Sequence, residues 1–74
     1  VTLLNNLGTA YSALGDYKES IEYYEQALVI KRKIFPEVHP DIAILLNNLG
    51  LAYNVLEDHK KAIEYYEQAL EIIR

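Results

Sequence analysis

The chain has 74 residues, a formal net charge of −4 at pH 7 and no cysteine. A single core of this length supplies only about 3–5 kcal/mol of net stability, so we expect partners to support the fold. The lack of cysteine excludes disulfides and thiolate zinc sites. The negative charge and the scattered basic residues disfavour nucleic acid and anionic membranes as partners. We expect no metal, because His39 and His59 are far apart and match no zinc-binding spacing, and no cofactor.

Neither the hydropathy nor the start of the sequence marks a membrane or secreted protein. No apolar stretch reaches the ~20 residues of a membrane span. Val1 does not begin a signal peptide with a basic head and a cleavage site. We therefore expect a soluble chain. Because it starts without methionine and ends at Arg74 inside a helical pattern, we also expect it to be a segment of a longer protein.

The first predicted element is a helix over residues 2–14. Its apolar side chains recur with helical period and gather on one side, namely Leu3, Leu4, Leu7, Tyr11 and Leu14. The opposite side carries polar residues, namely Thr2, Asn5, Thr9 and Ser12. Gly8 costs roughly 1 kcal/mol of helix propensity, so we expect it to admit a closely packed neighbour.

A second helix is predicted over residues 17–34, after a turn at Gly15-Asp16. Glycine suits the left-handed position after a helix, Asp16 can cap the next helix, and Glu19 completes a capping box. The apolar side of this helix bears Tyr17, Ser20, Ile21, Tyr24, Ala27 and Leu28. We expect the leucine side of the first helix to pack on Ile21, Tyr24, Ala27 and Leu28.

Two prolines separate this helix from the next. Pro40 is suited to the first position of a third helix over residues 40–56, and Asp41 is favourable in its first turn. A fourth helix is predicted over residues 59–73, with Asp58 as its cap. Glu57 stands where the first turn has glycine, so the second turn should be less well specified.

The sequence repeats itself. The segment LLNNLG occupies residues 3–8 and 45–50, and IEYYEQAL occupies 21–28 and 63–70, so both recur with an offset of 42 residues. Because two identical segments recur with the same offset, the sequence predicts two copies of one helical hairpin. We therefore expect an all-α chain of tandem antiparallel hairpins, with one repeat at 1–34, an extension and turn at 35–42, and a second repeat at 43–74.

The residues that recur match a known repeat family. The first copy presents Leu4, Leu7-Gly8, Tyr11, Ser20, Tyr24 and Ala27, and the second presents Leu46, Leu49-Gly50, Tyr53, Ala62, Tyr66 and Ala69. This spacing resembles the tetratricopeptide signature, with leucine in place of the initial tryptophan and tyrosine in place of phenylalanine. Arg32 stands where the usual ~34-residue repeat turns at proline, so the second helix should continue to Phe35-Pro36. The longer repeat resembles the extended tetratricopeptide repeats of kinesin light chains.

The resemblance implies a protein-binding scaffold that holds a peptide or helix of a partner on the concave side of its first helices. The helical wheel places there Thr2, Asn5, Thr9 and Ser12, and in the second copy Ile44, Asn47, Leu51 and Asn54. Asn5 and Asn47 are the strongest candidates, because a side-chain amide both donates and accepts hydrogen bonds. The alternative is that they only bridge adjacent first helices. The first helices carry no basic residue between 1 and 14 or between 42 and 56, which disfavours a clamp for a terminal carboxylate.

Other conspicuous residues favour packing over chemistry. Tyr24 and Tyr66 lie on the apolar side and should be in the core, whereas Tyr23 and Tyr65 could pack at the helix junction or contact a partner. His59 should be exposed. Ser12 and Ser20 have no histidine or acid in a catalytic arrangement, and no glycine-rich phosphate loop exists, so we do not expect an enzyme.

A second functional hypothesis is self-assembly, which would make the isolated chain a homo-oligomer. Helical repeats stack through interfaces between neighbours, so uncapped ends can join end to end. The expected surface consists of Leu3, Leu7, Ala10, Ile63, Tyr66, Leu70 and Ile73. A hairpin exchange about residues 36–40 is the other possible mode, and the two prolines there favour stacking.

Overall fold

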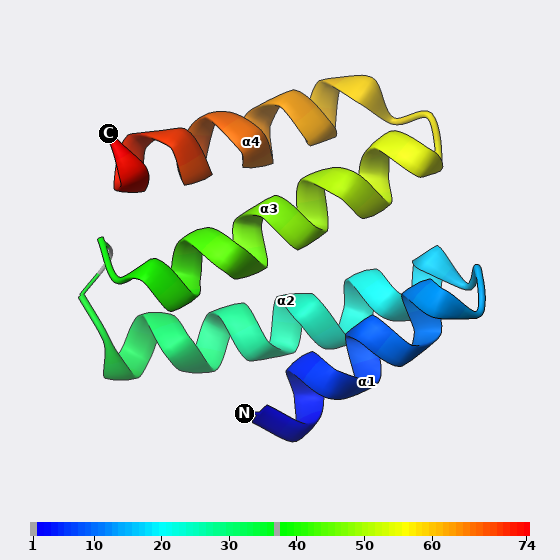
Figure 1. Cartoon of the computed structure of the whole chain (residues 1–74), viewed down its shortest axis with the longest axis horizontal. Coiled ribbons are helices and arrows are strands. Elements are labelled where there is room, and N and C mark those ends of the chain that lie inside the picture. The colour runs from blue at the N-terminus through cyan, green and yellow to red at the C-terminus, as the bar shows by residue number, and fades with distance from the viewer. Residues whose placement is uncertain (1, 37) are drawn as a thin grey trace.

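The computed structural model contains four α-helices joined by short connections (Figure 1). α1 spans Thr2–Ala13, α2 spans Tyr17–Ile34, α3 spans Pro40–Val55 and α4 spans His59–Ile73. The structure describes residues 2–36 and 38–74, and of Thr2 the backbone alone. Within these ranges there is no strand, and each helix begins and ends within one residue of its predicted bounds. The all-α prediction is confirmed.

α3 forms the centre of the molecule. The helices lie antiparallel in one row, so that α3 packs on α2 on one side and on α4 on the other (Figure 1). Ile42, Leu46 and Leu49 of α3 are completely buried, with exposed fractions of 0 %. Fully burying such a side chain contributes roughly 1.5–3 kcal/mol. Half of the buried apolar residues therefore lie on one helix that has neighbours on both sides.

The predicted caps form at the starts of α2 and α4. The Asp16 carboxylate accepts the backbone N–H of Glu19 at 3.4 Å, and the Asp58 carboxylate accepts that of Lys61 at 3.3 Å. Such caps satisfy amides that have no partner inside the helix and contribute about 0.5–2 kcal/mol each. The same device thus starts the second helix of both hairpins.

The two tight turns have the same backbone shape but different residues. Gly15 has a φ of +84° and Glu57 a φ of +67°, both in the left-handed region. A residue with a Cβ pays roughly 1–2 kcal/mol there, whereas glycine does not. Glu57 therefore holds a conformation that suits glycine, as its position in the repeat indicated.

The helical glycines allow the two helices of each hairpin to approach closely. A Cβ added to Gly8 would lie 2.7 Å from the Tyr24 ring, and one added to Gly50 would lie 2.7 Å from the Tyr66 ring. Real Cβ contacts are essentially never that short. The predicted packing reason for Gly8 is confirmed, and the same reason applies to Gly50.

The predicted apolar side of α1 is only partly covered. Leu4, Leu7 and Tyr11 are half-buried, but Leu3 and Leu14 have exposed fractions of 70 % and 80 %. The prediction that all five residues pack on α2 is therefore wrong for Leu3 and Leu14. Among the described helices α1 packs chiefly on α2, so the side that bears Leu3 has no second neighbour. Leu14 lies beyond the end of α1, in the turn.

Candidate functional site

A small pocket lies where α1, the end of α2 and the start of α3 meet. Its volume is about 120 Å³, and it is lined by Asn5, Lys31, Asp41, Ile44 and Leu45. The side-chain oxygen Oδ1 of Asn5 is buried and has no hydrogen-bond partner among the described residues. An unsatisfied buried acceptor costs about 1–3 kcal/mol. This oxygen therefore forms no hydrogen bond to α3, and its acceptor capacity is unused among the described residues.

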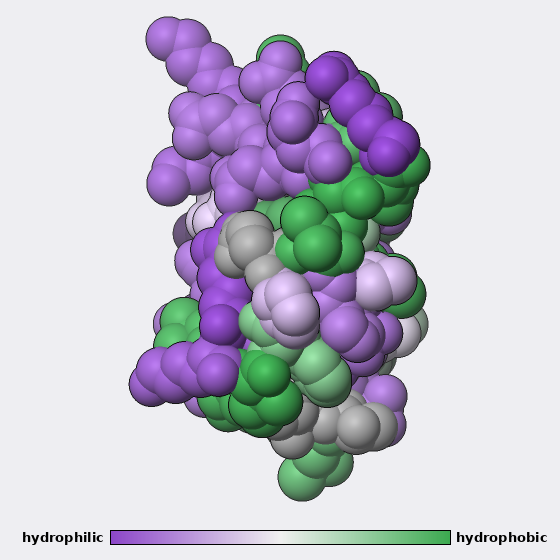
Figure 2. All heavy atoms as spheres, turned by 90° about the vertical axis from the view of Figure 1, so that its left-hand side faces the viewer, coloured by the Kyte–Doolittle hydropathy of each residue, from purple (hydrophilic) through white to green (hydrophobic). Residues whose placement is uncertain are grey.

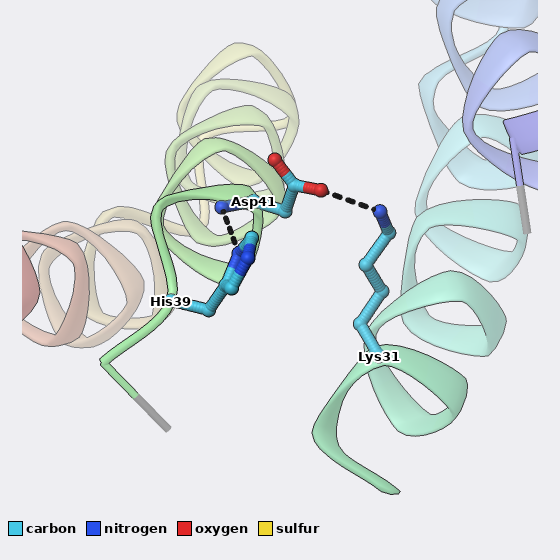
Figure 3. A network of polar contacts seen from close by, with 3 residues as sticks. All are labelled: Lys31, His39 and Asp41. Carbon is cyan, nitrogen blue, oxygen red and sulfur yellow. Dashed lines mark hydrogen bonds and ion pairs between the residues drawn. The ribbon is translucent and has the colours of Figure 1, made fainter. Parts of the chain in front are cut away.

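Lys31 and Asp41, which both line this pocket, belong to a polar network that also includes His39 (Figure 3). Lys31 Nζ donates to Asp41 Oδ2 at 2.9 Å, and the Asp41 backbone N–H donates to His39 Nδ1 at 3.1 Å. The hydrogen bond from Lys31 holds the pKa of the Asp41 carboxyl below its usual 3.8. His39 is the N-cap of α3, and its ring stacks on Phe35 with centroids 4.1 Å apart. The network fixes the start of α3 against the end of α2.

The equivalent position in the second hairpin is wider and more apolar. A pocket of about 320 Å³ is lined by Pro40, Ala43, Ile44, Asn47, Ala69 and Ile73. With the offset of 42 residues, Asn47 matches Asn5 and the apolar Ile73 matches Lys31. Figure 2 views the end of the molecule where α3 begins and α4 ends, and it shows apolar patches interrupted by hydrophilic surface. A ligand along this end meets both polar and apolar groups.

The other predicted groove residues of α1 are engaged within the first hairpin. The Thr9 hydroxyl lies 3.0 Å from the Tyr24 hydroxyl and donates to the Asn5 carbonyl at 3.1 Å. The Ser12 and Ser20 hydroxyls lie 2.6 Å apart. The hydroxyls of Thr9 and Ser12 therefore contact α2, which the helical wheel did not predict, while Thr9 remains exposed. The side chain of Thr2 lies outside the described part of the chain.

The predicted groove residues of α3 are more open. Ile44 and Leu51 have exposed fractions of 55 % and 52 %, and Asn47 is also exposed. Asn54 is exposed, but its Oδ1 lies 2.7 Å from Nδ1 of His59, which ties the end of α3 to the start of α4. Ile44, Asn47 and Leu51 thus remain accessible on one helix.

The tyrosine pairs are packing residues. Tyr23 stacks on Tyr11 and Tyr65 stacks on Tyr53, each pair with centroids 5.5 Å apart. Of the two readings, packing at the helix junction is the one found. Tyr24 is buried, as expected for the core, and its counterpart Tyr66 is half-buried.

The residues of the expected self-association surface are mostly open. Leu3, Ile63, Leu70 and Ile73 have exposed fractions of 70 %, 56 %, 46 % and 68 %. Ala10 is exposed, and Leu7 and Tyr66 are half-buried. They fall into two separate groups, one on α1 and one on α4.

Lys31 lines the first pocket but was not among the predicted site residues. That prediction considered basic residues on the first helix of each repeat only, and Lys31 lies on the second. Its ammonium group comes from the extended part of α2 and lines the pocket beside Asn5. The signal was present in the sequence, because Lys31 follows Tyr24, Ala27 and Leu28 on the buried side of a helix. A basic group therefore does face the groove, although Asp41 is already its partner.

Within residues 2–36 and 38–74, no group of three or more His, Cys, Asp or Glu residues is placed to hold a metal ion. No helix in the described part of the chain is long and apolar enough to cross a membrane.

Two hairpins with one sequence register, the second packed on the first, define an α-helical repeat protein. The chain belongs to the tetratricopeptide repeat family, since the family model of that description matches residues 1–74. A search of curated proteins found no match. Tetratricopeptide repeats are generally non-catalytic, and membership of the family makes this chain a module of protein–protein interaction in general.

Proposed function

We propose that the chain binds an extended segment of a partner protein along α1 and α3, with Asn5 and Asn47 as the main polar contacts. The observation that carries the proposal is the Asn5 side-chain oxygen, which is buried, lines a pocket and has no partner among the described residues. A backbone N–H of the bound segment can donate to this oxygen. This hydrogen bond would remove the free-energy cost of the unsatisfied acceptor, and the gain would favour binding.

The composition of the two pockets supports a ligand with polar backbone and apolar side chains. Ile44 contributes to both pockets and is 55 % exposed, so it offers apolar surface between the two asparagines. Asn5 and Asn47 recur once per repeat, which suits a chain that runs across both repeats. The Lys31–Asp41 ion pair gives the first pocket a polar wall, whereas Ile73 makes the second apolar. The 42-residue repeat and the extended second helix support a kinesin-light-chain-like subclass.

A displayed library of random, unstructured peptides tests this function. We expect it to yield peptides that bind the chain, and the double variant Asn5→Ala with Asn47→Ala to bind them at least about tenfold more weakly. Helicity and the free energy of unfolding should not fall, because the oxygen of Asn5 has no internal partner to lose. Asn6→Ala is the matched control, since Asn6 is exposed on the same helix and lines neither pocket. Selected peptides that bind the double variant with unchanged affinity would contradict the proposal.

The open apolar surfaces on α1 and α4 support a second function, association of copies of the chain into an array. Its alternative mode, a hairpin exchange about the 36–40 connection, has less support. His39 caps α3 and Pro40 occupies its first turn, so a single helix through this segment would lose a cap and break its hydrogen bonds at proline.

A further inference from the structure

Identical segments of α2 and α4 differ in what covers them. Ile21 and Leu28 of α2 have exposed fractions of 8 % and 5 %, whereas the equivalent Ile63 and Leu70 of α4 have 56 % and 46 %. α3 packs on α2 and covers its apolar side. Among the described residues, no helix does the same for α4 on the side away from α3. The apolar surface that α3 covers on α2 is therefore repeated on α4, where it is uncovered.

The same chain also carries an uncovered copy of the helix that does the covering. Leu45, Leu49 and Ala52 of α3 have exposed fractions of 2 %, 0 % and 1 %. With the 42-residue offset, they match Leu3, Leu7 and Ala10 of α1, which are exposed, half-buried and exposed. α1 repeats the LLNNLG segment of α3 without change. Both halves of the α2–α3 interface thus recur, unpaired, at opposite sides of the molecule.

We propose that α1 of a second copy docks on the α3/α4 side of the first, head to tail, in the register that α3 adopts on α2. Leu3 and Leu7 of the second copy then cover Ile63 and Leu70. The internal interface predicts a further contact. Arg32 of α2 donates to the Gln68 side chain of α4 at 3.0 Å, so Arg74 should meet Gln26 of the second copy.

The charges favour α1 of the second copy, rather than its α4, as the helix that docks on α4 of the first copy. The exposed surface of α4 carries Glu64, Glu67 and Glu71, so two α4 surfaces placed together would oppose their carboxylates. α1 carries no charged side chain over its whole length. The internal interface is a precedent, because α3 has Asp41 as its sole charged residue and packs on α2, which carries several charged side chains of both signs. An uncharged helix is therefore the natural cover for α4.

The interface joins two different surfaces and is consequently heterologous. Each added copy presents one new α1 surface and one new α4 surface, so association does not stop at a dimer unless the rotation closes a ring. The groove proposed above lies along α1 and α3, and it would continue from copy to copy. This assembly does not depend on that groove binding a peptide, so either proposal can fail without the other.

Sedimentation of the 74-residue chain over a concentration series is the first test. We expect the average mass to rise with concentration and to pass that of a dimer. Leu3→Lys and Leu70→Lys should each weaken association at least about tenfold, because each buries an unpaired ammonium in the interface. Leu14→Lys is the matched control, since Leu14 is 80 % exposed and is not among the covering residues. All three variants should keep their helicity.

Mixing the two lysine variants decides the direction of the contact. The Leu3→Lys variant keeps an intact α4 surface and the Leu70→Lys variant an intact α1 surface, so the mixture should form a one-to-one dimer and nothing larger. A dimer that only Leu70→Lys disrupts would indicate an α4–α4 contact and overturn the proposal. Association that neither variant weakens would indicate hairpin exchange and also overturn it, as would a wild-type chain that stays monomeric at high micromolar concentration.

Discussion

Tyr24 and Tyr66 occupy the same position in two identical octapeptides, yet Tyr24 is 3 % exposed and Tyr66 is half-buried. The two hairpins have the same caps, the same turn shape and the same glycine contacts, so local structure does not explain the difference. The neighbours do, because α2 packs on both α1 and α3, whereas α4 packs chiefly on α3 among the described helices. In a repeat protein, how deeply a side chain is buried depends on the neighbouring repeats and not only on the sequence of its own repeat.

The largest test of this comparison replaces equivalent leucines of the two hairpins. Leu49→Ala should lower the free energy of unfolding by about 2–5 kcal/mol, because Leu49 has an exposed fraction of 0 %. Leu7→Ala, the matched change in half-buried surroundings, should lower it by clearly less. Urea unfolding followed by circular dichroism measures both. Equal losses would show that burial in the two hairpins does not differ as described.

Adding a methyl group to the helical glycines tests the same difference on a smaller scale. Gly8→Ala forces a Cβ against the enclosed Tyr24 ring, and overpacking of this kind costs about 1–3 kcal/mol. Gly50→Ala meets the more open Tyr66 ring, which can move away, while alanine regains about 1 kcal/mol of helix propensity. We expect Gly8→Ala to lower the melting temperature and Gly50→Ala to change it little. A larger loss for Gly50→Ala would contradict this reasoning.

The turns allow a reciprocal exchange. Glu57→Gly should raise the free energy of unfolding by roughly 1 kcal/mol, because glycine relieves the left-handed backbone at φ +67°. Gly15→Glu should lower it by a similar amount and serves as the mirror control. If both changes are neutral in denaturant unfolding, the left-handed turns are not a source of the expected strain.

The smallest expected effect is alkaline destabilisation from the second tyrosine pair. Burial, and next the charge of Glu25 on α2, raise the pKa values of Tyr53 and Tyr65 above the usual 10.0. The folded state therefore keeps protons that the unfolded chain has lost. This contribution to stability is complete below about pH 10 and is lost as the pH rises through the folded-state pKa values. Melting temperatures measured from pH 8 upward should fall less steeply in Tyr53→Phe than in the unchanged chain.

Most of the fold could be predicted from the sequence, because its signals are local. Proline at the start of α3, the Asp16 and Asp58 caps and the left-handed turns fixed the helix bounds to within one residue. The exposure of Leu3 could not be predicted, since its identical counterpart Leu45 is buried. Only the number of neighbouring helices distinguishes the two residues, and a helical wheel contains no information about it.

The candidate site was predicted less completely. Asn5 and Asn47 each line a pocket, whereas the hydroxyls of Thr9 and Ser12 lie within hydrogen-bond distance of those of Tyr24 and Ser20 on α2. A helical wheel does not show which side chains of a neighbouring helix a hydroxyl reaches, so it could not predict these contacts. The contribution of Lys31 depends on how far α2 extends past the usual repeat length.

The stacked tyrosines have a consequence for following how the molecule unfolds. The chain has no tryptophan, and Tyr11–Tyr23 and Tyr53–Tyr65 are parallel pairs confined to one hairpin each. Near-ultraviolet circular dichroism depends on such fixed aromatic packing. When phenylalanine replaces one pair, the difference between the spectra of the unchanged chain and the variant reports the hairpin that held this pair. The molecule thus contains a separate optical reporter for each of its halves, which can reveal whether the two halves lose structure together.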